Sequence, residues 1–351
     1  MNPTLSPGII GGPAAWRGPQ IDAQRDWILH FNSTELAELD SAVRKFQEAQ
    51  LEMGQISPST FPLPSLAPKL AQIKTELMRG RGFALLRGFE VGNYSLEQAA
   101  IAYLGLGAHI GSFRSQNAKG HLLGHVRDLG LNIKDPKVRY YQTNRALDYH
   151  TDSCDIVGLL CLKTAKEGGK SRLVSSVALH DALYQQRPEL WRALFNAFPT
   201  DRRGEIPVGM LPWFDMPVFN WFEGQLTTIY VGQYIRSAQA LFPEARRLSA
   251  LELEAIEVLD QWADDDAFAL SMEFLPGDMQ FVHNHQILHS RTDFENWPEP
   301  ERQRHLFRLW LAPVEARRLP PVFESRYGSI EPGARGGIIT QNTKLTFSIT
   351  P

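Results

Sequence analysis

The feature that most constrains the fold is a series of short, mainly apolar segments bounded by glycine, proline or polar turn residues. Segments of this length predict buried strands rather than helices. They occupy residues 82–88, 156–162, 173–177, 279–282 and 304–311. Because strands and helices do not alternate regularly and no glycine-rich phosphate loop is found, a nucleotide-binding parallel sheet is disfavoured. We predict a mostly antiparallel sheet, closed or nearly closed on itself, with a small-molecule cavity in its mouth.

Helices are predicted where a capping residue precedes apolar residues at helical spacing. Capping-box pairs at residues 32–35, 95–98 and 249–252 open three such helices, the second reaching about Leu104. A further helical section at residues 178–195 is broken at a proline. These helices are expected to cover the sheet with their apolar faces.

We expect residues 1–351 to form a single domain, because no compositional shift marks a linker. An N-terminal arm and helical support (1–80) precede a β core with inserted loops and helices (81–312), and a C-terminal arm (313–351) follows. Residues 1–30 are rich in proline and glycine, which predicts an arm that packs on the body without regular structure of its own. The tail after Leu319 has a similar composition, which predicts a wrapping arm or a partly disordered segment. Gly168-Gly169-Lys170-Ser171 predicts a turn that joins its two neighbouring strands as a hairpin.

Composition narrows the class of partner. The chain has 43% hydrophobic and 21% charged residues and a formal net charge of −3, so nothing favours nucleic acid or an anionic membrane surface. Met1–Gly8 lacks the pattern of a signal peptide, and no apolar run approaches the roughly 20 residues of a membrane span. With only Cys154 and Cys161, a disulfide scaffold is not expected. We expect a cytoplasmic protein that acts on a small molecule, with homo-oligomerisation left open.

The stretch Tyr149–Ser153 contains an imidazole and a carboxylate two residues apart, at His150 and Asp152. If the segment is extended, both side chains lie on one face of a strand. With a second histidine from elsewhere they would form the two-His, one-carboxylate set that holds non-haem Fe(II) and leaves positions open. Cys154 would share that face, so a further ligand or a redox role is conceivable, although a small buried hydrophobe is the simpler interpretation.

Three histidines downstream compete for the remaining ligand position. His283 and His285 have strand spacing and could themselves be a metal pair, whereas His289 stands closer to the next strand.

That strand favours His289. Alternation in residues 304–311 places Arg304, Leu306, Arg308 and Trp310 on one face and His305, Phe307, Leu309 and Leu311 on the other. An apolar opposite face implies burial, so the arginine face is predicted to line a cavity and to need an anionic partner. An edge strand with two solvated arginines is the alternative. An iron with three protein ligands can also take a bidentate 2-oxo acid and O2, and Arg304 is our candidate for the far carboxylate of 2-oxoglutarate.

The combination of His150-x-Asp152, the distal His289, and Arg304 with Arg308 resembles the taurine dioxygenase and clavaminate synthase-like family of Fe(II)- and 2-oxoglutarate-dependent dioxygenases. The strand at 82–88, the Gly168–Ser171 turn and the segment from Asn284 to Thr292 support the resemblance, which covers roughly residues 80–312.

This resemblance implies a double-stranded β-helix, or jelly roll, of the cupin type with helical additions. Its metal ligands map onto His150, Asp152 and His289. Its 2-oxoglutarate residues map onto Arg304 and Ser171. Arg308 can face either the cosubstrate or the substrate.

The implied reaction is the oxidation, in the first place hydroxylation, of an unactivated C–H bond in a small polar or anionic metabolite, with release of succinate and CO2. Because halogenating relatives lack the carboxylate, the presence of Asp152 argues against a halogenase. Asn144, Arg145 and Arg308 are the candidate substrate contacts, because the loop 107–149 leads directly into His150.

Two other classes of function stay open on the sequence. A zinc-dependent hydrolase could use His150, Asp152 and one of His283 or His289, but this leaves the buried arginine strand unexplained. A non-catalytic metal- or ligand-binding barrel would need only the fold.

Overall fold

The computed structural model describes residues 8–132 and 138–350. Its centre is a pair of sheets, one of seven strands and one of four. The larger sheet contains β1 (Ile28–His30), β2 (Phe83–Arg87), β14 (Met279–His283), β6 (Ile156–Lys163), β17 (His305–Ala312) and β3 (Ser112–Phe113), with β4 (Leu123–Val126) also on β17. The smaller contains β13 (Leu270–Met272), β8 (Ser171–Ser175), β15 (Ile287–Arg291) and β5 (Leu147–His150). Neighbouring strands are antiparallel except β1 and β2, which confirms the predicted sheet type.

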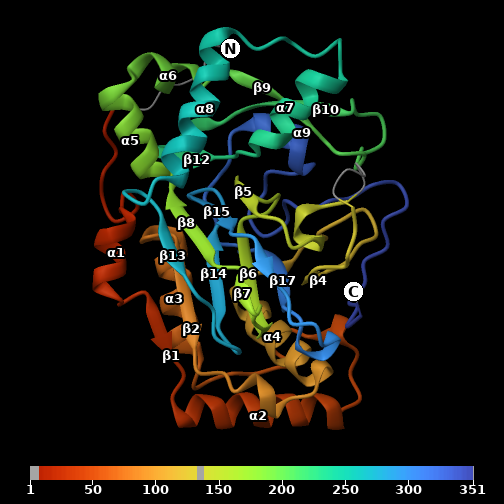
Figure 1. Cartoon of the computed structure of the whole chain (residues 1–351). Coiled ribbons are helices and arrows are strands. Elements are labelled where there is room, and N and C mark those ends of the chain that lie inside the picture. Colours follow the sequence, from red (N-terminus) through yellow and green to blue (C-terminus); the bar gives the residue numbers. More distant parts are fainter. Residues whose placement is uncertain (1–7, 133–137, 351) are drawn as a thin grey trace.

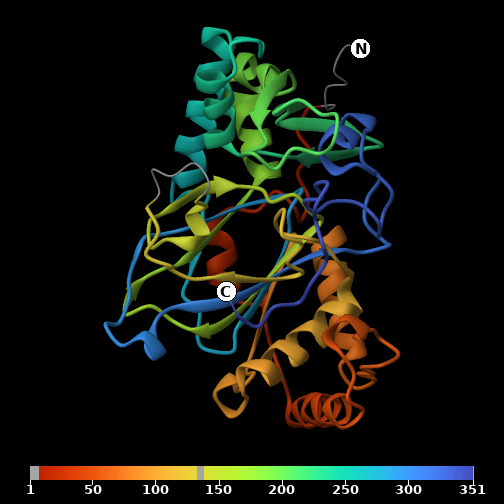
Figure 2. The same cartoon turned by 90° about the vertical axis from the view of Figure 1, so that its right-hand side faces the viewer.

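Helices cover both ends of this strand layer. Figures 1 and 2 show α5, α6, α7 and α8 together at one end and α2 at the other. The first group comprises α5 (Ser176–Gln186), α6 (Pro188–Ala193), α7 (Gly232–Leu241) and α8 (Ala250–Asp264). It packs with the short pairs of β9 (Ala197–Asp201) with β10 (Trp213–Pro217) and β11 (Phe219–Phe222) with β12 (Gln225–Thr228). The second group comprises α2 (Ser33–Glu48), α3 (Ala67–Arg79) and α4 (Leu96–Ile110).

The predicted helix starts are confirmed in their physical detail. Asn32, Ser95 and Ser249 each accept a hydrogen bond from the third helical backbone N–H, and the residue there caps back. The second of these helices continues to Ile110 rather than ending near Leu104, because its apolar residues pack on the sheet over their whole length. The helical section at 178–195 is divided at Pro188, where α6 begins.

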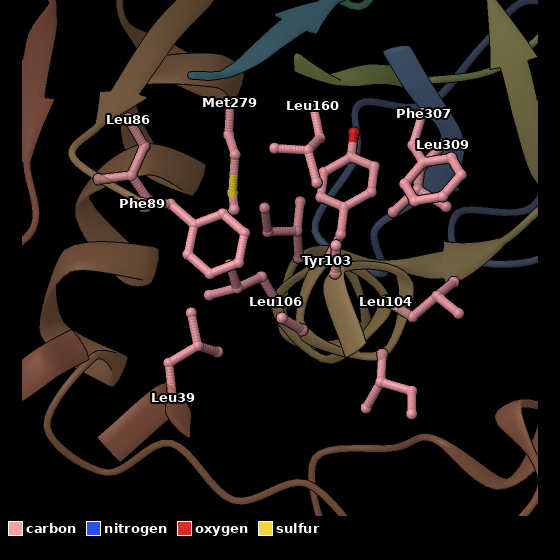
Figure 3. Packing of buried hydrophobic residues seen from close by; sticks show 14 of the residues in the cluster. Leu39, Leu86, Phe89, Tyr103, Leu104, Leu106, Leu160, Met279, Phe307 and Leu309 are labelled. Carbon is pink, nitrogen blue, oxygen red and sulfur yellow. The ribbon is translucent and has the colours of Figure 1, made fainter. Parts of the chain in front are cut away.

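The main core lies between α4 and the larger sheet. Figure 3 shows Tyr103 and Leu104 of α4 below Phe307 and Leu309 of β17, and Leu106 of the same helix on the side of Phe89 and Met279. Leu160 from a neighbouring strand lies between them. All of these side chains are fully buried. Burial of each is worth about 1.5–3 kcal/mol, which fixes β17 with its apolar face toward the helices. Its other face is therefore directed into the space between the two sheets.

One expectation about the chain ends was wrong. Residues 1–30, expected to lack regular structure, contain α1 (Gly18–Gln24) and β1, and β1 pairs with β2 in parallel. The tail contains a 3-10 turn at Pro321–Phe323 and α9 (Glu324–Tyr327) before it runs back to β4 (Figure 1). Local proline and glycine content did not reveal the parallel pairing of β1 with β2, because that contact joins segments distant in sequence. The tail lies along the body, as expected of a wrapping arm.

The predicted hairpin between residues 156–162 and 173–177 is also wrong. β6 pairs with β14 and β17 in the larger sheet, whereas β8 pairs with β13 and β15 in the smaller one. The Gly168-Gly169 turn carries the chain from one sheet to the other, with β7 (Glu167–Gly168) and β16 (Phe294–Glu295) paired beside it. Sequence spacing gives the turn but does not say which strand becomes the partner.

Within the described ranges, none of the helices has the length and apolar character that crossing a membrane would require.

Candidate active site

His150 and His289 are brought together by strand pairing. They are opposite residues in the antiparallel pair of β5 and β15, and their ring centroids lie 4.3 Å apart. Directly opposed residues in such a pair have neighbouring side chains on one face, so the register alone creates the two-imidazole arrangement. This face looks into the space between the sheets.

Asp152 reaches the same place by a different route from the one expected. β5 ends at His150, so His150 and Asp152 do not share one regular strand. The backbone N–H of Asp152 instead donates to Asn284 Oδ1 at 2.7 Å, and Asn284 Nδ2 donates to the carbonyls of Asp152 and Cys154. The Asn284 side chain thus fixes the backbone of this segment on one side, while Thr151 N–H donates to the Tyr230 carbonyl.

The three side chains form a compact donor set. One donor atom of each lies within 4.8 Å of those of the other two. Asp152 Oδ1 is 3.7 Å from His150 Nε2, and Asp152 Oδ2 is 3.8 Å from His289 Nε2. His150 Nδ1 lies 2.8 Å from the Asp148 carbonyl, which favours a proton on Nδ1 and leaves Nε2 free as a ligand. These donors fit a divalent metal of the iron type with open positions.

The rival histidines do not complete a metal site. In residues 8–132 and 138–350, His150, Asp152 and His289 are the one cluster of three or more such groups. His283 Nδ1 lies 3.3 Å from Arg317 Nη2, and His285 contacts Asp155, which also pairs with Arg335. Guanidinium charge beside both imidazoles opposes cation binding there.

Cys154 is buried beside the donor set, and its Sγ faces the Ile156 carbonyl at 3.3 Å. Burial raises the pKa of the Cys154 thiol well above its usual range, which keeps it protonated and unsuited to ligate a metal.

The surroundings of Asp152 keep it ionised. Burial alone would raise its pKa, but the Arg308 guanidinium and the two imidazoles outweigh burial and hold the pKa well below the usual range. Trp310 Nε1 donates to Oδ2 at 2.9 Å, and Arg308 Nη1 lies 3.4 Å from the same oxygen. Burial, and then the nearby His289, lower the pKa of His150 to about 4. At neutral pH the site therefore offers a carboxylate and a neutral imidazole, the forms that bind metal.

An inner pocket extends from the donor set between the two sheets. Its wall includes apolar Val157, Leu159 and Leu306 together with Ser171 and Arg304. Arg304 is 4% exposed, and its Nη1 is buried without a hydrogen-bond partner in the described structure.

Arg304 has no internal counter-charge. Its Nη2 approaches only the Gly169 carbonyl, at 3.5 Å, and no described carboxylate lies within 4.0 Å of it. Burial lowers the pKa of Arg304 to about 10, so the guanidinium stays charged at neutral pH. A buried, unpaired cation of this kind requires an anionic ligand.

The Gly-Gly turn makes room for this guanidinium. Gly168 and Gly169 have φ of 74° and 69°, the left-handed region. A Cβ on Gly169 would lie 2.9 Å from Arg304 Nε, and one on Gly168 would lie 2.3 Å from the Asp293 carbonyl oxygen. Only glycine fits both demands. Ser171, just beyond the turn, is buried with its Oγ 3.1–3.2 Å from the Gln280 side-chain amide.

Arg308 lies between the two pockets and is held from both sides. Its Nε donates to Gln116 Oε1 at 2.7 Å, and Gln116 Nε2 donates back to the Arg308 carbonyl at 2.8 Å. Its remaining nitrogens face Asp152 and the Tyr141 ring. The side chain is thus placed to orient the carboxylate of the donor set.

An outer pocket opens on the other side of His150 and Asp152, toward β9, β10 and α7. Tyr140, Tyr234, Arg202 and Arg326 are among its lining residues. Asn144 and Arg145 are exposed and line neither pocket, because the backbone of their turn is used to bind Arg291 and β16. These two predicted substrate contacts are therefore not brought to the site.

Several site residues were not identified from the sequence. Arg291 is 6% exposed, lines the inner pocket and has an unpartnered Nη1; its position two residues after His289, on the same strand face, was the available signal. The sequence pattern places Asn284 in the segment from Asn284 to Thr292 but gives it no role of its own. Arg202 and Arg326 carry no local signal at all, because their positions follow from the packing of β9 and α9 on the barrel.

Comparison with known proteins places this geometry in a family. Residues 42–310 match the model of the taurine catabolism dioxygenase TauD, TfdA family. The chain is 28% identical over 319 residues to FR-33289 synthase of Streptomyces rubellomurinus, covering 89% of this chain and 92% of that protein. It is 30% identical over 323 residues to the taurine hydroxylase-like protein SAT17 of Stachybotrys chartarum, covering 90% and 83%.

Solved structures with the same fold are non-haem iron oxygenases. An asparagine oxygenase in complex with Fe(II), hydroxyasparagine and succinate has a TM-score of 0.63 at 16% identity and covers 81% of this chain and 93% of its own. OrfP in complex with Fe and α-ketoglutaric acid has a TM-score of 0.60 at 13% identity, with the same coverage. The jelly-roll prediction is confirmed. The chain belongs to the TauD, TfdA family and is a non-haem iron oxidoreductase that uses Fe(II), 2-oxoglutarate and O2.

Proposed function

We propose that this enzyme hydroxylates an unactivated C–H bond of a small polar or anionic metabolite. The observation that carries the proposal is the donor set of His150, Asp152 and His289 at the junction of two pockets, one of which ends at an unpaired buried guanidinium. One pocket suits the cosubstrate and the other the substrate. The asparagine oxygenase and OrfP have been solved in complex with hydroxylated amino acids, which supports a small polar substrate.

In this proposal His150, Asp152 and His289 hold Fe(II). When bound, Fe(II) with 2-oxoglutarate and O2 supplies the oxidative decarboxylation that gives succinate and CO2 and the oxidation of the substrate C–H bond. The protein's part is to position the reactants and to exclude side reactions.

Arg304 is the proposed anchor for the far carboxylate of 2-oxoglutarate. Its guanidinium can give two parallel N–H donors to a carboxylate, and the apolar walls from Val157 and Leu306 strengthen that pairing by excluding water. Ser171 can add a hydroxyl donor by turning from Gln280. Arg291 adds a second positive charge at the same pocket.

Arg308 and Trp310 are proposed positioning residues for Asp152. Both donate to Asp152 Oδ2, so they fix the rotation of the Asp152 carboxylate and leave Oδ1 directed toward His150 Nε2. Arg308 also borders the outer pocket, where it can contact a substrate.

The experiment that tests this proposal is an anaerobic titration of the iron-free protein with Fe(II) and then 2-oxoglutarate. We expect a weak visible charge-transfer band on addition of the 2-oxo acid. His150→Ala and Asp152→Ala should lose the band and turnover altogether, while Arg304→Ala should need far more 2-oxoglutarate to reach it. His30→Ala, an exposed histidine on β1, is the matched control and should behave as wild type.

Each other result contradicts a definite part of the proposal. A band that survives in both His150→Ala and Asp152→Ala would mean that the metal lies elsewhere. Tight binding of zinc without any band would point to the hydrolase reaction, which family membership does not favour. A band without succinate release in the presence of any small metabolite would leave a non-catalytic barrel.

A further inference from the structure

The outer pocket contains a buried cation that pairs with no carboxylate in the part of the chain that the structure describes. Arg202, the residue after β9, is 3% exposed. Its Nε donates to the Leu211 carbonyl at 3.1 Å and its Nη2 to the Ser325 carbonyl at 2.5 Å, while Nη1 is buried without a hydrogen-bond partner in the described residues. Two backbone carbonyls therefore fix the guanidinium of this pocket-lining residue, and its third nitrogen keeps no partner among the described residues.

A second guanidinium stands beside the first. Arg326 of α9 and Arg202 both lie over the ring of Phe214, with Cζ 5.4 Å and 5.0 Å from its centroid. Arg326 Nη2 donates to Ser153 Oγ at 2.5 Å, one residue from Asp152. Both arginines and both His150 and Asp152 line the same pocket. The two cations therefore line the same cavity, which reaches His150 and Asp152.

The neighbouring acids are already engaged. Glu205 lies 3.4 Å from Arg139, and Asp201 lies 4.0 Å from Arg203 and accepts a hydrogen bond from Ser237. Neither Arg202 nor Arg326 has a carboxylate within 4.0 Å among the residues that the structure describes.

This charge carries a cost in free energy. Burial, and then the charge of Arg326, lower the pKa of Arg202 to about 10, and burial lowers that of Arg326. Arg202 is buried and Arg326 is half-buried, and Glu205, the carboxylate that acts on Arg326, already pairs with Arg139. Two like charges in such a site are unfavourable unless a further anion compensates them.

We propose that Arg202 and Arg326 form a subsite for an oxyanionic group on the substrate, at the end remote from the C–H bond that reacts. The inference rests on the proposed function, because it assigns the outer pocket to the substrate. Carboxylate, sulfonate, phosphonate and phosphate groups share the required chemistry, since each accepts hydrogen bonds from two guanidiniums. Anchoring the far end orients the rest of the molecule toward the metal.

The test uses propyl compounds that differ only in their head group. Propylphosphonate, propanesulfonate, butyrate, propylammonium and propan-1-ol are titrated calorimetrically into the full-length protein, with and without Fe(II) and 2-oxoglutarate under anaerobic conditions. We expect the three anions to bind and the cation and the alcohol not to bind. The tightest of the three anions identifies the preferred head group.

The variants assign the binding to the two arginines. Arg202→Gln and Arg326→Gln should each lower the affinity for the anions at least about tenfold. Arg202→Lys, which keeps the charge, should retain part of the affinity. Arg25→Gln, an exposed arginine 63% accessible, is the matched control. The 2-oxoglutarate charge-transfer band should stay unchanged in every variant, because Arg202 and Arg326 lie outside the inner pocket.

The failures are separable. If wild type shows no charge-transfer band, the proposed function is wrong whatever the anions do. If the band appears but the anions bind no better than propan-1-ol, or Arg202→Gln and Arg326→Gln leave their affinity unchanged, the subsite is refuted. A fall in thermal stability of the two variants without any loss of anion affinity would assign the pair a structural role only.

Discussion

Two regions of this molecule bury arginine in opposite ways. On the tail-covered side, meaning the surface contacted by residues 328–350, Arg335 and Asp155 are both 0% exposed and form an ion pair at 2.6 Å. In the inner pocket, Arg304 is 4% exposed and has no carboxylate partner. The burial is nearly the same, and the difference is whether the chain supplies the anion.

The contrast separates structural charge from functional charge. All three guanidinium nitrogens of Arg335 donate hydrogen bonds, to Asp155 and to the carbonyls of Ile330 and Arg317, so none is left for a ligand. It ties the tail to the residues that follow Asp152. Arg304 instead keeps a buried nitrogen without a partner among the described residues, so an anionic ligand can satisfy it. A buried arginine is thus a candidate ligand contact when its internal partner is missing.

The largest expected effect comes from breaking the satisfied pair. Arg335→Met leaves Asp155 buried without its counter-charge, so we expect the free energy of unfolding to fall by about 3–5 kcal/mol. Chemical denaturation measures this. Removing both charges in Arg335→Met with Asp155→Leu should restore a large part of the loss. An unchanged midpoint in the single variant would show that the pair does not hold the tail.

Removing the unpaired charge of Arg304 should weaken ligand binding and leave the stability of the fold intact. Arg304→Met is expected to weaken 2-oxoglutarate about 100-fold, equivalent to about 2.7 kcal/mol, while thermal stability stays the same or rises. Titration of the charge-transfer band measures the affinity for 2-oxoglutarate, and differential scanning calorimetry measures the thermal stability. Arg318→Met, an arginine 72% exposed, is the control. A loss of stability comparable to that of Arg335→Met would abolish the distinction between the two regions.

A smaller effect on ligand binding is expected from Trp310, whose Nε1 donates a hydrogen bond to the Asp152 carboxylate. Trp310→Phe removes the hydrogen bond to Asp152 Oδ2 and keeps the ring, so iron should bind about tenfold more weakly with little change in 2-oxoglutarate affinity. Competition with a chelator of known affinity measures it. Equal weakening of iron and 2-oxoglutarate would indicate a general disturbance of the pocket.

The smallest expected effect concerns protons on the tail-covered side. His305 Nε2 lies 2.9 Å from His125 Nδ1, and burial, and then His125, lower the pKa of His305 to about 3. Between that value and the unfolded pKa near 6.5 only the unfolded chain binds the proton, so stability falls as pH falls through this window.

The variant His305→Asn has no imidazole at this position, so it takes up no proton there on unfolding. From pH 6.5 to 5.5 the iron-free wild type should lose about 1 kcal/mol more than His305→Asn. Denaturation at the two pH values measures the difference. Parallel losses in both proteins would show that His305 does not titrate on unfolding.

Much of the site followed from local pattern. The alternation in residues 304–311 predicted that Arg304, Leu306 and Arg308 face a cavity, and all three line the inner pocket while Phe307 and Leu309 lie in the core. His150 and Asp152 were noticed by their spacing, although the strand ends between them. Asn144 and Arg145 were chosen for their nearness to His150 in sequence, and such nearness does not show where a turn directs its side chains.

The sequence by itself determined five of the central strands, the inward face of β17, the capped helices and the residue types able to hold iron and a carboxylate. Hydrophobic periodicity and capping suffice for these features because they act within a few residues. The tertiary structure alone decided that β6 and β8 lie in different sheets, that His289 is opposite His150, and that Arg335 is paired whereas Arg304 and Arg202 are not. Each of these depends on which distant segments pack together. Periodicity selects the face of a strand and leaves its partner undetermined.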